Sequence, residues 1–199
     1  GDYGLGIVPI RDDATVRFAA IDIDDYDADA GALAQQCREI GLPAVACTTK
    51  SDGVHLYVFF AEPGAPADRV RAVLDRIAAA LGYPGVEVFP KQDSLADGDV
   101  GNWINLPYHA GDRTIRYAVD NGDFVPLADF VALAESRQTT VDALEAVELP
   151  EPPEAPSEDM WTRAAQGTLT WTVDPNTGLV NDGRDAFMLW LALILYWEM

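Results

Sequence analysis

Two aspartates interrupt an otherwise apolar stretch near the start of the chain, F-A-A-I-D-I-D at residues 18–24. The side chains of a β-strand alternate between its two faces, so a strand here places Asp22 and Asp24 on one face. Like charges that close repel each other unless a cation lies between them. Carboxylate oxygens are the ligands that Mg²⁺ and Mn²⁺ prefer. The pair therefore predicts a divalent-cation site, against the alternative of a strand that ends in a solvated acidic turn.

A turn that leads into a histidine is the second candidate. Residues 50–53 (K-S-D-G) have the composition of a turn, and His55 follows at the start of the next expected strand. Turn amides and a lysine ammonium group both favour negative charge, so Lys50, Ser51 and Gly53 are candidates to hold phosphate oxygens. His55 could donate a hydrogen bond to a phosphate. The alternative is a surface histidine at the end of a strand.

A third carboxylate and a second lysine occur in V-E-V-F-P-K-Q at residues 86–92. Glu87 lies between two apolar residues of an expected strand, where an unpaired carboxylate is costly to bury. A bound metal ion would remove that cost, and Lys91 could reach an anionic ligand of the same ion. The alternative is an edge strand whose Glu87 faces water.

The segment G-N-W-I-N-L-P at residues 101–107 places Trp103 and Asn105 on one face of a short expected strand. An amide in an apolar strand usually hydrogen-bonds a specific partner, so Asn105 is a candidate to contact the sugar or base of a nucleotide. Trp103 is either a core residue or a stacking residue. Tyr57, two residues after His55, is expected to pack rather than to contact a ligand.

Three carboxylates, a histidine and a lysine are the groups that two-metal nucleotidyl transfer needs. In chain order the motifs are D-I-D (22–24), S-D-G-V-H (51–55), V-E-V-F-P-K-Q (86–92) and G-N-W-I-N-L-P (101–107). This set resembles the archaeo-eukaryotic primase superfamily over about residues 4–135. Within the superfamily it is most similar to the primase-polymerases of phages, cyanophages among them, and of plasmids and other mobile elements.

The resemblance implies an archaeo-eukaryotic primase fold with an RRM-like catalytic subdomain. It implies that Asp22, Asp24 and Glu87 bind two Mg²⁺ or Mn²⁺ ions and that His55 contacts the phosphates of the incoming nucleotide. The implied activity is that of a DNA primase-polymerase, which starts or extends chains from nucleoside triphosphates. The implied partners are a single-stranded DNA template, a primer–template and a helicase domain in cis or in trans. Arg113 and Arg116 are weaker candidates to hold template or triphosphate.

Two other functions remain open at this point. One is a catalytically silent nucleotide- or nucleic-acid-binding domain that keeps the same motifs. The other is a metal-dependent nuclease such as a rolling-circle initiator, an enzyme that uses two histidines flanking one apolar residue and a nearby nucleophilic tyrosine. The sequence His55-Leu56-Tyr57 does not fit that pattern.

Strands and helices in a β-α-β-β-α-β order predict an α+β domain in which helices flank a mixed β-sheet. We expect strands over 16–24, 43–49, 55–60, 86–89, 103–106 and 114–119, helices over 28–40, 67–81, 127–136 and 141–147, and a hairpin turn at Asn121-Gly122. The catalytic domain is expected over 1–147, an acidic Pro-rich linker over 148–159 and a helical extension over 160–199. That extension either docks on the catalytic domain or is the beginning of a helical priming domain. If it is the beginning of a priming domain, this chain should extend existing primers well and start new chains poorly.

The formal net charge of −20 argues against non-specific adhesion to nucleic acid, so any DNA contact must come from a local basic patch. Cys37 and Cys47 form no C-x-x-C pair, and the chain has two histidines, so no zinc site and no disulfide framework is expected. The chain shows no signal-peptide pattern and no apolar run long enough to span a bilayer. We therefore expect a cytoplasmic protein without membrane contact, in the host cytoplasm if the protein is viral.

Overall fold

The computed structural model describes residues 5–150. In that range the strands are β1 (Gly6–Ile7), β2 (Thr15–Val16), β3 (Phe18–Ile23), β4 (Val45–Thr48), β5 (Val54–Phe59), β6 (Ala65–Pro66), β7 (Glu87–Phe89), β8 (Ile104–Asn105), β9 (Ala118–Asp120) and β10 (Asp123–Phe124). The helices are α1 (Ala30–Glu39), α2 (Ala67–Ala80), α3 (Leu127–Ser136) and α4 (Val141–Glu145), with a 3₁₀ turn, η1 (Gly111–Arg113). Most of the linker expected over 148–159, and the whole extension expected over 160–199, lie outside the described residues.

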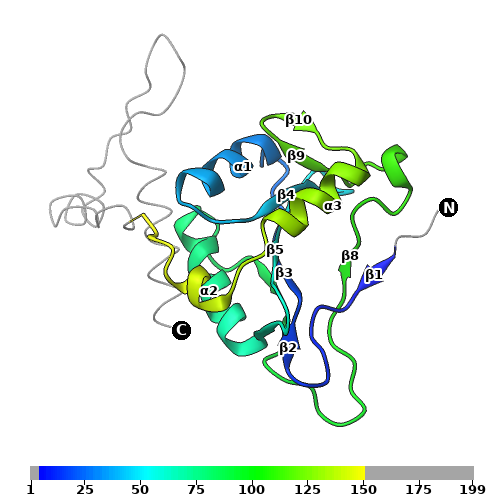
Figure 1. Cartoon of the computed structure of the whole chain (residues 1–199). Coiled ribbons are helices and arrows are strands. Elements are labelled where there is room, and N and C mark those ends of the chain that lie inside the picture. The colour runs from blue at the N-terminus through cyan, green and yellow to red at the C-terminus, as the bar shows by residue number, and fades with distance from the viewer. Residues whose placement is uncertain (1–4, 151–199) are drawn as a thin grey trace, which may run out of the picture. The chain divides into compact units, whose positions relative to one another are not determined.

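Six strands form the central sheet in the order β10-β9-β4-β5-β3-β7. The strands from β10 to β3 are labelled in Figure 1. The strands β3 and β4, which α1 connects, are separated in the sheet by β5. The strands β5 and β7, which α2 connects, are separated by β3. This split β-α-β arrangement is the RRM-like subdomain that the resemblance implies. The α+β fold class is therefore confirmed.

The strand directions differ from the expected mixed sheet. All five pairings between neighbours in the six-stranded sheet are antiparallel. The reason is that each helical crossover joins two parallel strands that are not neighbours, because an antiparallel strand lies between them. Element order along the chain could not show this, since it leaves open which strands are adjacent.

The two long helices are specified locally. Asp29 caps α1 by accepting a hydrogen bond from the Ala32 N–H (2.7 Å), and the helix buries Leu33, Ala34 and Cys37. The apolar stripe of α2 has the helical spacing noted in the sequence, and its buried members are Val70, Val73, Leu74 and Ile77. Both helices lie within two residues of their expected ends.

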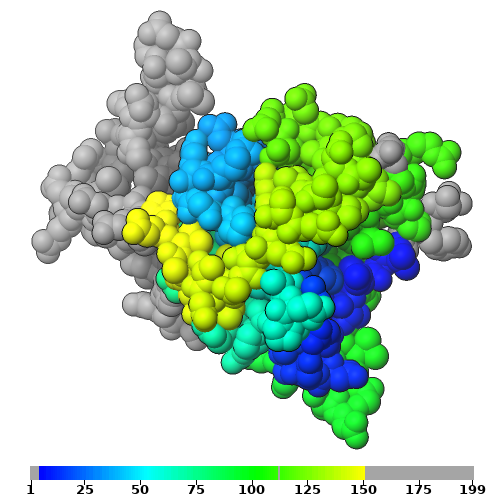
Figure 2. All heavy atoms as spheres, viewed as in Figure 1, coloured from blue at the N-terminus to red at the C-terminus, as the bar shows by residue number. Residues whose placement is uncertain are grey.

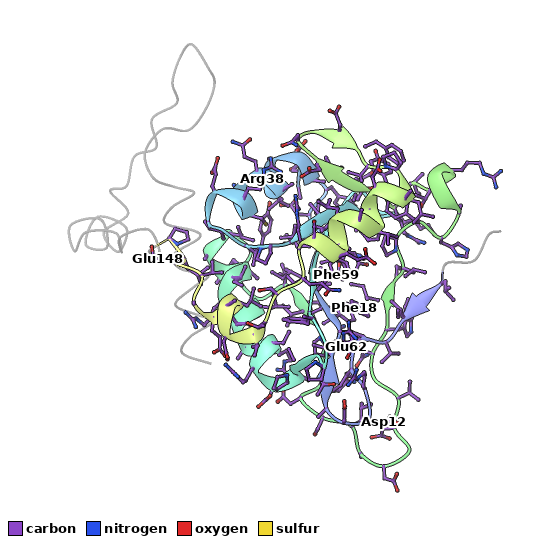
Figure 3. All side chains as sticks on the ribbon, viewed as in Figure 1. Asp12, Phe18, Arg38, Phe59, Glu62 and Glu148 are labelled. Carbon is purple, nitrogen blue, oxygen red and sulfur yellow. The ribbon has the colours of Figure 1, made fainter. Side chains whose placement is uncertain are left out.

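The sheet separates two apolar clusters. On one face, Ile21 and Leu56 pack with residues of α1, α2 and α4. On the other, Tyr57 and Phe89 pack with Ile104 of β8 and with residues of α3. Phe18 and Phe59 are cross-strand partners at one end of that second face (Figure 3). Figure 2 shows atoms of α1, α3 and α4 at one surface of the molecule.

The expected hairpin turn is confirmed between β9 and β10, where Asn121 and Gly122 have φ values of 51° and 83°. Two positive φ angles are what a two-residue hairpin turn requires. This hairpin extends the sheet beyond β4, with β9 paired to β4 and β10 at the edge. Within residues 5–150, none of the helices combines the length and apolar character needed to cross a membrane.

Candidate active site

One row of side chains runs across the sheet on the face that carries β8 and α3. Asp22 of β3 is paired with His55 of β5 on one side and with Glu87 of β7 on the other. Cys47 of β4 continues the row beside His55. Directly opposed residues in antiparallel strands have Cβ atoms about 5 Å apart. The register thus brings an aspartate, a histidine and a glutamate from three separate motifs into line.

The turn that precedes β5 is pressed against the end of β3. A Cβ atom on Gly53 would lie 2.4 Å from the Ile23 carbonyl oxygen and 3.4 Å from the Cα of Asp24. The Gly53 N–H donates to Thr49 Oγ1 (2.9 Å), and the Thr49 N–H donates to the Gly53 carbonyl (2.9 Å). The Gly53 amide is therefore engaged inside the turn, and its contact to a phosphate stays a prediction. The close approach places Asp24 beside the turn.

His55 is held through its Nδ1 atom. That nitrogen lies 3.1 Å from the hydroxyl of Tyr57, and the hydroxyl donates to the backbone carbonyl of Asn105 (2.7 Å). His55 is 6% exposed and Tyr57 2% exposed. Burial raises the pKa of Tyr57 well above its usual range, with Cys47 and Asp22 adding to the rise and Arg116 opposing it. Tyr57 therefore remains a protonated donor.

Tyr57 and Asn105 each show a contact that the sequence did not predict, while the contact of the Asn105 amide with a nucleotide stays a prediction. Tyr57 does pack, as expected, but its hydroxyl also binds the histidine. Asn105 contacts Tyr57 through its main-chain oxygen rather than through its amide. The signal in the sequence was His55 and Tyr57 two residues apart, which a strand places on one face.

Asp22 has an unsatisfied oxygen. Its Oδ1 is buried and makes no hydrogen bond to the described residues, although His55 Nε2 lies 3.0 Å away. The two atoms are thus close together without the geometry of a hydrogen bond. A buried polar atom without a partner is costly, and a bound cation would relieve that cost.

Glu87 is paired with a lysine. Its Oε2 lies 2.6 Å from Lys91 Nζ, and the ammonium group also lies 5.0 Å from the centre of the Phe89 ring. The Glu87 side chain is 60% exposed, which agrees with the edge-strand alternative. Between residues 5 and 150, no three His, Cys, Asp or Glu side chains gather closely enough to hold a metal ion. The row supplies oxygen donors of the type that Mg²⁺ and Mn²⁺ bind, and the unsatisfied Asp22 oxygen fits such an ion, while Glu87 faces Lys91.

The remaining candidates lie on the turn before β5, in η1, and between η1 and β9. Lys50 and Ser51 are exposed on the turn, and Lys50 lines a pocket of about 340 Å³. Arg113 is exposed in η1. Arg116 has a buried Nε atom without a hydrogen-bond partner among the described residues, and its charge acts on Tyr57. Of the two arginines, Arg116 is therefore the one close to the row.

Trp103 is not a core residue. It is 60% exposed, and its indole ring lies against Gly6, where a Cβ atom would be 2.5 Å from the ring. Gly6 and Asn105 are paired between β1 and β8, and these two strands lie side by side in Figure 1. The small β1–β8 sheet thus carries an aromatic ring on its outer side and the Asn105 carbonyl toward Tyr57.

An RRM-like sheet that carries acids and a histidine from three motifs on one face defines a domain of the archaeo-eukaryotic primase type. Comparison with known families agrees: the family described as "TOTE conflict system, Archaeo-Eukaryotic Primase domain" matches residues 1–146. The chain belongs to this family. No curated protein matches the chain. The superfamily expected from the motifs is confirmed, and the family supports primase-like nucleotidyl transfer as the class of chemistry.

Proposed function

We propose that this domain is a DNA primase-polymerase that carries out template-directed nucleotidyl transfer with Mg²⁺ or Mn²⁺. The observation that carries the proposal is the cross-strand row Glu87–Asp22–His55, with Asp24 at the end of the same strand. Membership of the archaeo-eukaryotic primase family supports it. The more specific likeness to phage primase-polymerases remains a prediction.

Asp22 and Asp24, with Glu87, would hold the divalent ions. Ions bound there would supply positive charge that offsets the charge of the triphosphate and would lower the barrier to attack by a primer 3′-hydroxyl. Asp22 is suited to this role because its buried oxygen makes no hydrogen bond to the described part of the chain. Its low exposure also excludes water, which strengthens a charge interaction at this position.

His55 and the basic side chains of Arg116, Lys50 and Lys91 would bind the triphosphate. His55 is fixed by Tyr57, so its other nitrogen is turned toward Asp22. Arg116 adds a positive charge near Tyr57, and Lys50 adds one on the turn beside Asp24. Lys91 would exchange its contact with Glu87 for a phosphate oxygen when Glu87 binds a cation. The partners that follow from this proposal are a nucleoside triphosphate and a primer–template, with a helicase as a further prediction.

The test is primer extension by the full chain. A labelled primer–template with Mn²⁺ should lengthen when deoxynucleotides are present. Replacing both Asp22 and Asp24 by alanine should lower the rate by about 10³-fold or more, as loss of groups that stabilise transition-state charge does. Asp27→Ala is the matched control, because Asp27 is an exposed acid in the same segment and is outside the row. Retained activity in the double variant would refute the assignment.

A readout without turnover tests the metal site separately. Mn²⁺ should raise the melting temperature of the wild-type chain, because a ligand that binds the folded state stabilises it. The Asp22→Asn variant should lose that shift, while Asp27→Ala should keep it. An equal shift in all three proteins would place the bound ion elsewhere.

A second candidate is a nucleotide-binding domain without catalysis. The observation that favours it is the ion pair between Glu87 and Lys91, because a Glu87 carboxylate that binds Lys91 does not bind a metal ion at the same time. In this case deoxynucleotides would protect the fold against thermal unfolding, and the labelled primer would keep its length. Shortening of the primer in the same incubation would instead indicate the nuclease.

A further inference from the structure

Tyr57 is the middle member of a hydrogen-bond chain that ends on the backbone. The Asn105 carbonyl can only accept, and it lies 2.7 Å from the Tyr57 hydroxyl. A phenol has one proton, so that proton is committed to Asn105. The hydroxyl oxygen can then only accept from His55 Nδ1, which lies 3.1 Å away. It follows that Nδ1 carries a proton.

The phenol ring is held on several sides. It stacks on Phe59, with ring centres 6.2 Å apart and planes 17° apart, and the imidazole of His55 meets it edge-on at 5.7 Å. The acceptor is equally fixed, because Asn105 belongs to β8 and is paired with Gly6 of β1. Burial keeps the Tyr57 hydroxyl protonated by raising its pKa. The hydrogen bonds therefore run in one direction, from His55 Nδ1 to the Tyr57 hydroxyl and from that hydroxyl to the Asn105 carbonyl.

We propose that Tyr57 is a positioning residue, which orients the His55 ring so that Nε2 faces Asp22; donation from Nε2 to a nucleotide phosphate requires a second proton on the ring. The Nε2 to Asp22 Oδ1 distance of 3.0 Å is the geometric consequence of this orientation. The phosphate contact rests on the proposed function. The orientation of the ring does not, because it follows from the protein's own hydrogen bonds.

The orientation can be measured without substrate. The chain contains two histidines, so a long-range ¹H–¹⁵N correlation spectrum of the full chain shows two ring systems, and His109→Gln assigns them. His55 should show a protonated Nδ1. Tyr57→Phe, which keeps the ring and removes the hydroxyl, should shift that nitrogen or give a mixture of tautomers. A bare Nδ1 in the wild-type protein, or a spectrum that Tyr57→Phe leaves unchanged, would overturn the proposal.

Tyr108→Phe is the matched control. Tyr108 is a buried tyrosine of the same apolar cluster whose hydroxyl donates to the Val125 carbonyl and accepts from the Ala118 N–H. Removing its hydroxyl should lower stability without changing the His55 signals. If Tyr108→Phe moves them as much as Tyr57→Phe does, the effect is a general loosening of the cluster and the proposal fails.

Kinetics separate positioning from a purely structural role. Tyr57→Phe should lower kcat/KM for the nucleotide about tenfold, the effect expected from losing one orienting hydrogen bond. In a His55→Ala background the same change should have no further effect, because the residue that it positions is gone. An equal loss in both backgrounds would overturn the proposal. If the wild-type chain has no polymerase activity, the proposed function fails, and the spectra still decide the role of Tyr57.

Discussion

Replacement of Gly53 by alanine tests whether the turn before β5 positions the site. The added Cβ atom would lie 2.4 Å from the Ile23 carbonyl oxygen and 3.2 Å from Thr49 Oγ1. Ordinary contacts to a Cβ atom begin at 3.4 Å, so the turn and the end of β3 must separate by about 1 Å. The closest of these neighbours is a backbone atom, which cannot rotate away as the end of a side chain can.

Two effects of different size follow for Gly53→Ala. Overpacking at this position should lower the free energy of unfolding by about 1–3 kcal/mol. The same 1 Å displacement moves Asp24 and Lys50 relative to each other, and a misplacement of that size can cost about 10²-fold in rate. We therefore expect kcat/KM for primer extension to fall by about 10²-fold while the protein remains folded.

Gly82→Ala separates the two effects. Gly82 has φ +93°, and a Cβ atom added there would meet nothing within 4 Å, so alanine strains the backbone without touching the site. It should cost about 1–2 kcal/mol of stability and leave kcat/KM unchanged. The assays are urea denaturation and steady-state primer extension. The reasoning is refuted if Gly53→Ala keeps wild-type kcat/KM, or if both variants lose activity equally.

Three further outcomes concern the fold. Leu56→Ala should lower the free energy of unfolding in urea by about 2–5 kcal/mol, because Leu56 is fully buried; a loss below about 1 kcal/mol would contradict its place in the core. Burial raises the pKa of Cys37 from 9.0 to about 11, so the folded state holds more protons than the unfolded state in that window. Stability should therefore fall as the pH rises from 9 to 11, with a weaker fall in Cys37→Ala. Arg137→Ala should cost about 1–3 kcal/mol, because Arg137 bonds both Asp120 and a main-chain carbonyl; Arg38→Ala, an exposed contact to the same aspartate, should cost less than about 1 kcal/mol.

The helices and most of the expected strands were accessible from local patterns, whereas the strand expected over 114–119 begins only at Ala118. Asp29 before α1 and the helical spacing in α2 are local signals, and so is the Asn121-Gly122 pair. The strand directions were not accessible in the same way. They depend on β5 inserting between β3 and β4, a pairing between segments that are not consecutive in the chain. Local patterns predicted the helices and strands and left the strand order open, and the RRM-like arrangement was expected only from the resemblance.

The acids of the site were found because each one breaks an apolar pattern. Asp22 and Glu87 do so in strands that are neighbours in space and about 65 residues apart in sequence. The sequence did not show that Asp22 and Glu87 lie in different environments. Asp22 lies between two strands and its side chain is 16% exposed, while Glu87 lies on the edge strand and meets Lys91. The D-I-D spacing is equally compatible with a solvated turn, and only the position of β3 inside the sheet decides between them.

The role of Tyr57 needed information that no local pattern holds. A tyrosine in an apolar strand is usually a packing residue, and the sequence around His55 offers no acceptor for its proton. The acceptor comes from β8, about 50 residues later, where the pairing of Asn105 with Gly6 turns a main-chain carbonyl toward the sheet. A main-chain oxygen has the same chemistry in every residue, so no residue type could mark it. The orientation of the histidine therefore depends on where a strand lies rather than on which side chain it carries.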